Sequence, residues 1–290
     1  MSARLGLGTA TFIPGYGLAP AGRPGPDLLD AAFSAGVRYV DTAAAYADSE
    51  GALGQVADRV RSLDVRVATK LPAGPAEPTR ESCRDAMEAS LARMGLATAD
   101  TVLLHSASAD QVASPAVAEA WTSLRDGGLV ARVGASTYGI EAARLAVSTS
   151  WCDTVQVEFS ILNQSVVTDL RQTTRPVEVI ARSVLCKGLL TSSARGLLLP
   201  GGAAKTLQAL DAVAGGLGMD LTTLAIRFAL DTPGIDVVLV GISSKAELDL
   251  AVAAAARAPL SANEYGIVAA FDRSAEEWSH PERWREGTLA

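Results

Sequence analysis

The chain has 290 residues, of which 49% are hydrophobic and 20% are charged, and its formal net charge at pH 7 is −7. This composition supports a large apolar core and does not fit an intrinsically disordered chain. The negative charge argues against nucleic acids and anionic membranes as partners, because proteins bind both through basic surfaces. The first ten residues lack the apolar segment of a signal peptide, and no apolar run approaches the roughly 20 residues of a membrane span. We therefore expect a soluble, cytoplasmic protein.

Few side chains are suited to bind metals or to form disulfides. The three cysteines are Cys83, Cys152 and Cys186, which are odd in number and widely separated, and the two histidines are His105 and His280. This spacing indicates neither a disulfide framework nor a zinc site. We expect no metal centre.

Short apolar segments rich in β-branched residues recur along the chain and predict eight strands. These segments cover residues 5–9, 37–42, 65–70, 101–106, 131–136, 154–159, 177–185 and 236–243. Amphipathic patterns between most of them predict helices over residues 26–35, 79–94, 112–126, 141–148, 221–230 and 245–256. A strand followed by a helix, repeated along the chain, indicates a parallel sheet with right-handed crossovers.

Eight such units in about 250 residues are typical of a (β/α)8 barrel. We predict this α/β fold, a (β/α)8 TIM barrel, as a single domain over residues 1–290. The alternative is an open doubly wound sheet, but GLGTAT at 6–11 has only two of the glycines that its dinucleotide loop needs. The longest irregular segment, 192–205, follows the seventh strand and is expected to be a functional loop.

Polar side chains follow three consecutive strands at the points where these strands end. Asp41 ends the second strand, Tyr46 lies in the loop after it, Lys70 ends the third strand and His105 ends the fourth. Each has a structural interpretation, as a cap, a packing aromatic, a solvated lysine or a hydrogen-bonded core histidine. In a barrel, however, chemistry takes place at the carboxyl ends of the strands. Their occurrence together therefore favours an active site.

Seven segments, spread over nearly the whole chain, make the interpretation specific. They are YVDTAAAYADSEGALG (39–54), VATKL (67–71), LLHS (103–106), VGAST (133–137), VQVEF (155–159), ARSVLCKGLL (181–190) and VLVGISSKAELDLA (238–251). In this order they resemble the aldo-keto reductases. The resemblance implies a (β/α)8 barrel that binds a nicotinamide cofactor without a Rossmann domain, which would explain the incomplete glycine fingerprint.

The resemblance implies that the four strand-end residues carry out carbonyl reduction. Tyr46 would donate the proton, although a free tyrosine, with a pKa of about 10, is a weak acid. A neighbouring ammonium lowers that pKa by stabilising the phenolate, and Lys70, kept charged by Asp41, is the candidate. His105 would orient the carbonyl and stabilise negative charge on its oxygen.

The resemblance also implies which residues hold the cofactor. Ser136, Thr137 and Gln156 match the positions that bind the nicotinamide carboxamide, and Thr137 departs from the usual asparagine. Arg182 lies where many members carry a tyrosine that stacks on nicotinamide, and a planar guanidinium can also stack. The pyrophosphate and the adenosine phosphate are expected near Ser183, Leu185, Gly241, Ser243 and Ser244.

Glu247 stands about where members that use NADP carry an arginine for the 2′-phosphate. A carboxylate repels this phosphate and can accept a hydrogen bond from a 2′-hydroxyl instead, whereas Lys245 could compensate. The sequence leaves both NADP and NAD as candidate cofactors, and NADP is favoured because the family commonly uses it. We expect a small carbonyl or alcohol as the substrate, and a weak likeness of 181–190 to bacterial members suggests a sugar-like one. Tyr16 and Trp278, from the segments 11–20 and 276–284, are candidates for the pocket wall.

Two other functions stay open. One is a nicotinamide-binding regulatory protein with little turnover, against which the complete set of strand-end residues counts. The other is a non-redox sugar-modifying enzyme on a related barrel. Such enzymes usually use metal ligands or paired carboxylates, and the strand ends offer only Asp41 and the nearby Glu158.

Overall fold

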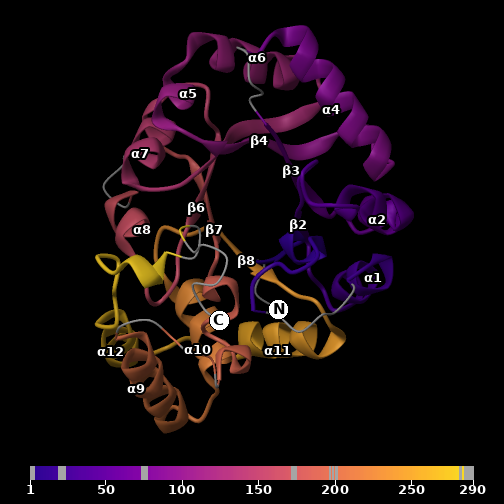
Figure 1. The fold of residues 1–290 in the computed structure, drawn as a ribbon. Helices are drawn as coiled ribbons and strands as arrows, with labels where there is room; N and C mark the ends of the chain where they lie inside the picture. Colours follow the sequence, from indigo (N-terminus) through magenta and orange to yellow (C-terminus); the bar gives the residue numbers. More distant parts are fainter. Residues whose placement is uncertain are drawn as a thin grey trace.

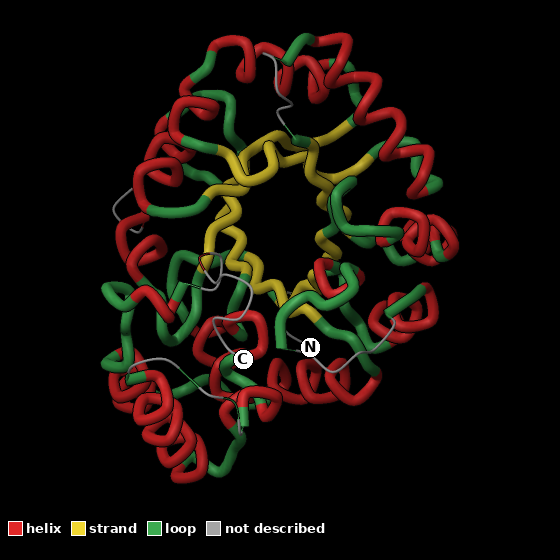
Figure 2. The backbone as a smooth tube through the Cα atoms, viewed as in Figure 1, coloured by secondary structure: helices red, strands yellow, loops and turns green. Residues whose placement is uncertain are grey.

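The computed structural model describes residues 4–18, 24–72, 78–170, 175–195, 197, 199, 202–280 and 283. In these residues the chain forms a closed barrel of parallel strands in the order β1 to β8, with helices around it. Figure 2 shows the strands as an inner ring and the helices as an outer one, and the colours of Figure 1 run once around the ring. The predicted (β/α)8 barrel is confirmed. That one domain covers all of residues 1–290 stays a prediction.

The eight strands lie close to their predicted positions. They are β1 (Leu5–Gly8), β2 (Tyr39–Asp41), β3 (Arg66–Leu71), β4 (Ala99–Ala107), β5 (Val130–Thr137), β6 (Thr154–Glu158), β7 (Glu178–Arg182) and β8 (Val237–Gly241). β1 pairs with both β2 and β8, which closes the barrel. β7 ends at Arg182 instead of continuing to residue 185, because Ser183 has a φ of 62°, outside the β region.

Helices follow most of the strands and cover the outside of the barrel. They are α1 (Pro26–Ser34), α2 (Ser49–Gln55), α3 (Ala57–Ser62), α4 (Arg80–Met94), α5 (Ala109–Ala113), α6 (Pro115–Asp126), α7 (Ile140–Ser148), α8 (Ser165–Leu170), α9 (Ala203–Gly216), α10 (Leu221–Asp231), α11 (Lys245–Ala256) and α12 (Ala262–Ala269). The single helix predicted over 112–126 is two helices. Pro115 cannot continue a helix but suits its first turn, and Ser114 caps α6 by accepting from the backbone N–H of Val117.

The core has two parts. Between the helices and the barrel lie fully buried side chains such as Phe33, Trp121 and Phe228, each of which contributes roughly 1.5–3 kcal/mol on burial. A separate cluster of strand residues fills the barrel interior: Tyr39, Ala68, Ile180, Val237 and Leu239. This filling makes the barrel a solid scaffold, so its functional groups lie at the strand ends.

The amino ends of the strands are held by charged side chains. Arg66 of β3 donates to Glu178 of β7 at 2.7 Å, although β3 and β7 are not neighbours in the barrel. Arg66 also donates to both oxygens of Asp100, which accepts from Arg132 as well. This network closes one end of the barrel and leaves the opposite end for the site.

Four 3-10 turns complete the described chain: η1 (Ala10–Phe12), η2 (Cys186–Gly188), η3 (Ser192–Ala194) and η4 (Glu277–Ser279). The segment 192–205, predicted to be irregular, contains η3 and the start of α9, and residues 196, 198, 200 and 201 lie outside the described residues. Among the described residues no single helix is long and apolar enough to cross a membrane. Only α9 and α10 taken together reach that length and composition, and they are bent by 81°.

Candidate active site

A buried ion pair joins the carboxyl ends of β2 and β3. Lys70 Nζ lies 2.5 Å from Asp41 Oδ2 and donates a second hydrogen bond to the carbonyl oxygen of Thr42 at 3.0 Å. The lysine side chain is fully buried. This burial lowers the pKa of Lys70, and the carboxylate of Asp41 opposes the effect. Lys70 therefore depends on Asp41 to keep its charge.

Tyr46 is carried over this ion pair by the loop after β2. The loop extends the pairing with β3, since the N–H of Ala44 donates to the carbonyl of Lys70 at 3.3 Å, and then turns with a hydrogen bond from Tyr46 N to Ala43 O at 2.9 Å. The Tyr46 ring centroid lies 4.8 Å from Lys70 Nζ, so the ammonium faces the ring. The ring of His105 meets it edge-on, with centroids 5.5 Å apart. The four predicted catalytic residues thus form one cluster.

The pKa of Tyr46 departs from the sequence-based expectation. Burial, followed by the charge of Asp41, raises this pKa above its ordinary value. The expected lowering by Lys70 is absent because its ammonium is hydrogen-bonded to Asp41, and because a buried phenolate loses its hydration. Burial, then the charges of Lys70 and Arg182, lower the pKa of His105 to about 4. At neutral pH, Tyr46 is therefore protonated and His105 is neutral.

A chain of hydrogen bonds extends the cluster to β5 and β6. Ser136 Oγ donates to Gln156 Oε1 at 3.2 Å, and Gln156 Nε2 donates to Asp41 Oδ1 at 2.7 Å. Next to Ser136, the buried Thr137 Oγ1 has no hydrogen-bond partner among the described residues. An unpartnered buried hydroxyl is costly. Ser136, Thr137 and Gln156 thus lie together in a buried layer beside the cluster, and their assignment to the nicotinamide carboxamide stays a prediction.

Arg182 lies at the end of β7 and is held from several sides. Its guanidinium carbon lies 3.9 Å from the centroid of the Tyr138 ring. Nη2 donates to the carbonyl oxygen of Thr137 at 2.6 Å and lies 3.7 Å from Glu158 Oε2. Arg182 therefore has a fixed orientation beside the cluster.

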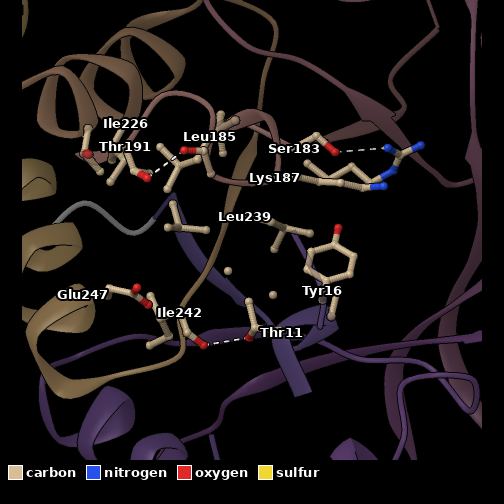
Figure 3. A pocket seen from close by; sticks show the side chains of 18 of the residues that line it. Thr11, Tyr16, Ser183, Leu185, Lys187, Thr191, Ile226, Leu239, Ile242 and Glu247 are labelled. Carbon is tan, nitrogen blue, oxygen red and sulfur yellow. Dashed lines mark hydrogen bonds between the residues drawn. The ribbon is translucent and has the colours of Figure 1, made fainter. Parts of the chain in front are cut away.

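A cavity extends from this cluster along β7, β8 and β1 (Figure 3). Its empty volume, open mouth included, is about 1160 Å³. Half of the predicted site residues line it, namely Asp41, Tyr46, Arg182, Ser183, Leu185, Gly241 and Glu247. The others lie outside its lining, namely Lys70, His105, Ser136, Thr137, Gln156, Ser243 and Ser244. The cavity thus connects the predicted catalytic cluster to the start of α11.

The cavity also has lining residues that the sequence did not single out. Among them are the polar residues Lys187, Thr191 and Thr222 and apolar residues such as Val184 and Ile226. Thr11, Ser192 and Ser193 also line the cavity, and they come from the segments 11–20 and 192–205, which the sequence predicts to be pocket wall and functional loop. Figure 3 shows Lys187 near Tyr16, and the N–H of Leu18 donates to the carbonyl of Lys187 at 2.7 Å. Tyr16 lines the cavity as predicted, but Trp278 is buried in the core instead. Of the segments 11–20 and 276–284, residues 19, 20, 281, 282 and 284 lie outside the described residues.

Glu247, in the first turn of α11, borders the far end of the cavity. Its Oε2 accepts hydrogen bonds from the backbone N–H of Ser243 at 2.6 Å and from Ser243 Oγ at 2.9 Å. Ser244 Oγ caps α11 by accepting from the N–H of Glu247 at 3.3 Å. Lys245 is exposed and pairs with Asp249 on the next turn. Both donors of Ser243, which were expected near a phosphate, are thus engaged within the protein.

No cluster of three or more His, Cys, Asp or Glu side chains suited to a metal ion occurs in the part of the chain that the structure describes.

Comparison with known proteins agrees with the barrel fold. The sequence model of the Aldo/keto reductase family matches residues 4–273. No curated protein matches the chain.

Several solved structures share the fold. An aldo-keto reductase from Bacillus halodurans, in its holo form, is 22% identical over 96% of this chain and 95% of that one, with a TM-score of 0.75. A glycerol dehydrogenase from Gluconobacter oxydans is 20% identical over 92% and 90%, with a TM-score of 0.71. A Bombyx mori aldo-keto reductase in complex with NADP is 22% identical over 93% and 89%, with a TM-score of 0.69.

Proposed function

Because the chain belongs to the aldo/keto reductase family, we propose that it is a nicotinamide-dependent oxidoreductase that reduces an aldehyde or ketone to an alcohol, or catalyses the reverse reaction. The observation that carries the proposal is the cluster that borders the cavity through Asp41 and Tyr46. There the Tyr46 ring contacts both the Lys70 ammonium and the ring of His105, and the carboxylate of Asp41 keeps the lysine charged. This arrangement offers one proton donor, one neutral hydrogen-bond donor and one buried charge.

The balanced reaction is carbonyl plus reduced cofactor plus H⁺ giving alcohol plus oxidised cofactor. A nicotinamide cofactor held beside the cluster would supply the hydride for the carbonyl carbon. Tyr46 gives its hydroxyl proton to the carbonyl oxygen, and its raised pKa keeps that proton in place at neutral pH. The neutral His105 can donate an N–H hydrogen bond to the same oxygen, which stabilises the negative charge that develops on it. The charge of Arg182, which opposes the rise in the pKa of Tyr46, stabilises the phenolate that Tyr46 becomes.

The cofactor assignment is also a proposal. Ser136, Thr137 and Gln156 would hold the carboxamide, as the unpartnered Thr137 hydroxyl supports. Ser183, Leu185 and Gly241 line the cavity between Arg182 and Glu247, where the dinucleotide's pyrophosphate would lie.

Two observations bear on NADP and NAD differently. The NADP bound by the Bombyx mori relative supports NADP. The Glu247 carboxylate supports NAD, because it occupies the donors of Ser243 and repels a phosphate. We propose that the cofactor is NADP or NAD. Kinetics of the Glu247 variant described in the Discussion distinguish between them.

The test is a panel of aldehydes, ketones and alcohols, glycerol among them because of the Gluconobacter oxydans relative, followed by nicotinamide absorbance with both cofactors. Cofactor binding is measured in parallel by protein fluorescence. Turnover that is lost in Tyr46→Phe, with binding retained, supports the proposal. Binding without turnover on the panel would instead support a regulatory protein, and a chain that binds neither cofactor would refute the proposal.

A further inference from the structure

Two residues around Arg182 have no part in the mechanism above. Tyr138, directly after β5, leaves 42% of its surface exposed, which is high for a large aromatic side chain. Glu158, at the end of β6, is only 4% exposed, and its Oε2 has no hydrogen-bond partner among the described residues. Both contact the guanidinium of Arg182. Tyr138 and Glu158 therefore act on the same side chain, Arg182.

The contacts define which side of Arg182 faces the cavity. One face of the guanidinium lies against the Tyr138 ring, with 3.9 Å between the central carbon and the ring centroid. Its edge is held by the carbonyl oxygen of Thr137 at 2.6 Å and by Ser183 Oγ at 3.4 Å. Of Tyr138, Glu158 and Arg182, only the arginine lines the cavity. The positive charge thus borders the cavity, and the aromatic ring and the carboxylate lie behind it.

Glu158 is itself fixed in position behind Arg182. Its Oε1 accepts a hydrogen bond from the backbone N–H of Gly139 at 2.9 Å, while Oε2 lies 3.7 Å from Arg182 Nη2. Gly139 has a φ of 77°, which a glycine adopts without strain, and the hydrogen bond therefore also fixes the turn that follows Tyr138. A buried carboxylate is costly without an opposite charge. Arg182 supplies that charge, so the two residues fix each other.

The charge of Arg182 acts differently on the two forms of a nicotinamide cofactor. The oxidised ring carries a positive charge and the reduced ring is neutral. A fixed cation beside the ring raises the free energy of the oxidised form and leaves the reduced form nearly unaffected. The cation within the cluster, Lys70, has its charge balanced by direct contact with Asp41, whereas Glu158 lies farther from Arg182 and behind it.

The influence of Arg182 reaches the reacting groups. Burial, then Lys70 and Arg182, lower the pKa of His105, and Arg182 also opposes the rise in the pKa of Tyr46 that burial and Asp41 cause. A nicotinamide ring that reacts beside Tyr46 would lie within the same field.

We propose that Arg182 makes this site bind the reduced nicotinamide more tightly than the oxidised one, with Tyr138 and Glu158 as the positioning residues that hold its charge toward the cavity. The inference rests on the proposed function, since it requires a nicotinamide ring at this end of the cavity. It predicts that the reduced cofactor occupies most of the site when both forms are present at equal concentration, which loads the protein for reduction of a carbonyl.

The measured quantity is the ratio of the dissociation constants of the oxidised and reduced cofactor, obtained by titration with protein fluorescence in the absence of substrate. Arg182→Tyr keeps a planar group and removes the charge, so the ratio should fall by about tenfold, equivalent to about 30 mV in the potential of the bound two-electron couple. Arg182→Lys keeps the charge and is the matched control, with a ratio close to that of the parent. Far-UV circular dichroism verifies that each variant is folded.

Substitutions of Glu158 and of Tyr138 should change the ratio of dissociation constants in opposite directions. Glu158→Gln removes the negative charge behind Arg182 and should raise the ratio severalfold. Tyr138→Leu releases the guanidinium and should lower the ratio severalfold, whereas Tyr138→Phe keeps the ring and should not change it. An unchanged ratio in both Arg182→Tyr and Glu158→Gln, with cofactor still bound, would overturn this inference alone. Failure of the parent protein to bind either form would overturn the proposed function, and this inference with it.

Discussion

Lys70 and Asp41, at the ends of neighbouring strands, form an ion pair of 2.5 Å in which the lysine side chain is fully buried and the carboxylate nearly so. Each Asp41 oxygen has its own partner, since Oδ2 accepts from Lys70 and Oδ1 accepts from Gln156. One carboxylate therefore controls the charge of the lysine and the orientation of the amide. Tyr46 lies over the same ammonium, so changes at Asp41 affect both stability and catalysis.

Asp41→Asn should destabilise the protein by roughly 3–5 kcal/mol, because it leaves a buried ammonium without its counter-charge. Urea unfolding of parent and variant measures this difference. The control is the double variant Asp41→Asn with Lys70→Met, which removes both charges and should recover much of the lost stability. A double variant no more stable than Asp41→Asn would contradict the ion-pair explanation.

Tyr46→Phe should reduce the turnover number by about 10²–10⁴-fold, the usual effect of losing a general acid. The ring is retained, so its contacts with Lys70 and His105 persist and cofactor affinity should stay near that of the parent. Steady-state kinetics and a fluorescence titration measure the two quantities separately. A variant with near-normal turnover would mean that another group protonates the product.

His105 should make stability dependent on pH in a defined window. Burial, followed by the charges of Lys70 and Arg182, lowers the pKa of His105 from 6.5 to about 4. Between these values the unfolded chain binds a proton that the folded protein does not, so the free energy of unfolding falls as the pH falls from about 6.5 to 4. His105→Gln should lose less stability than the parent over this window in denaturant unfolding. Identical pH dependences would show that His105 titrates normally in the folded protein.

Glu247→Arg should raise the ratio of NADPH to NADH efficiency by roughly tenfold or more. The carboxylate adds negative charge where a 2′-phosphate would bind, like charges in such a position cost on the order of 1 kcal/mol or more, and each 1.4 kcal/mol is about tenfold in affinity. Steady-state kinetics with both cofactors at one ionic strength measures the ratio, because salt screens the effect.

Two control variants accompany this measurement. Glu247→Gln removes the charge but not the shape, and should shift the ratio in the same direction by less. Lys245→Met should leave it unchanged, because Lys245 pairs with Asp249 at the surface. A ratio that responds to Lys245 and not to Glu247 would show that the carboxylate does not face the adenosine end.

The sequence alone was sufficient for the barrel and for the residues that gather at the ends of β2, β3 and β4. Strand and helix periodicity are local, and in a barrel every strand carries its carboxyl end to the same face, so Asp41, Lys70 and His105 had to converge once the strands were recognised. The break before Pro115 was also a local signal, because proline favours the first turn of a helix.

Only the tertiary structure decided how these groups act on one another. Gln156 donates to Asp41 across 115 residues of sequence, and Tyr138, after β5, contacts Arg182 at the end of β7. Neither contact follows from the local sequence pattern. The direction of the pKa shift of Tyr46 depended on burial and on how closely Asp41 holds Lys70. Burial and distance are properties of the folded packing, and residue order along the chain does not contain them directly.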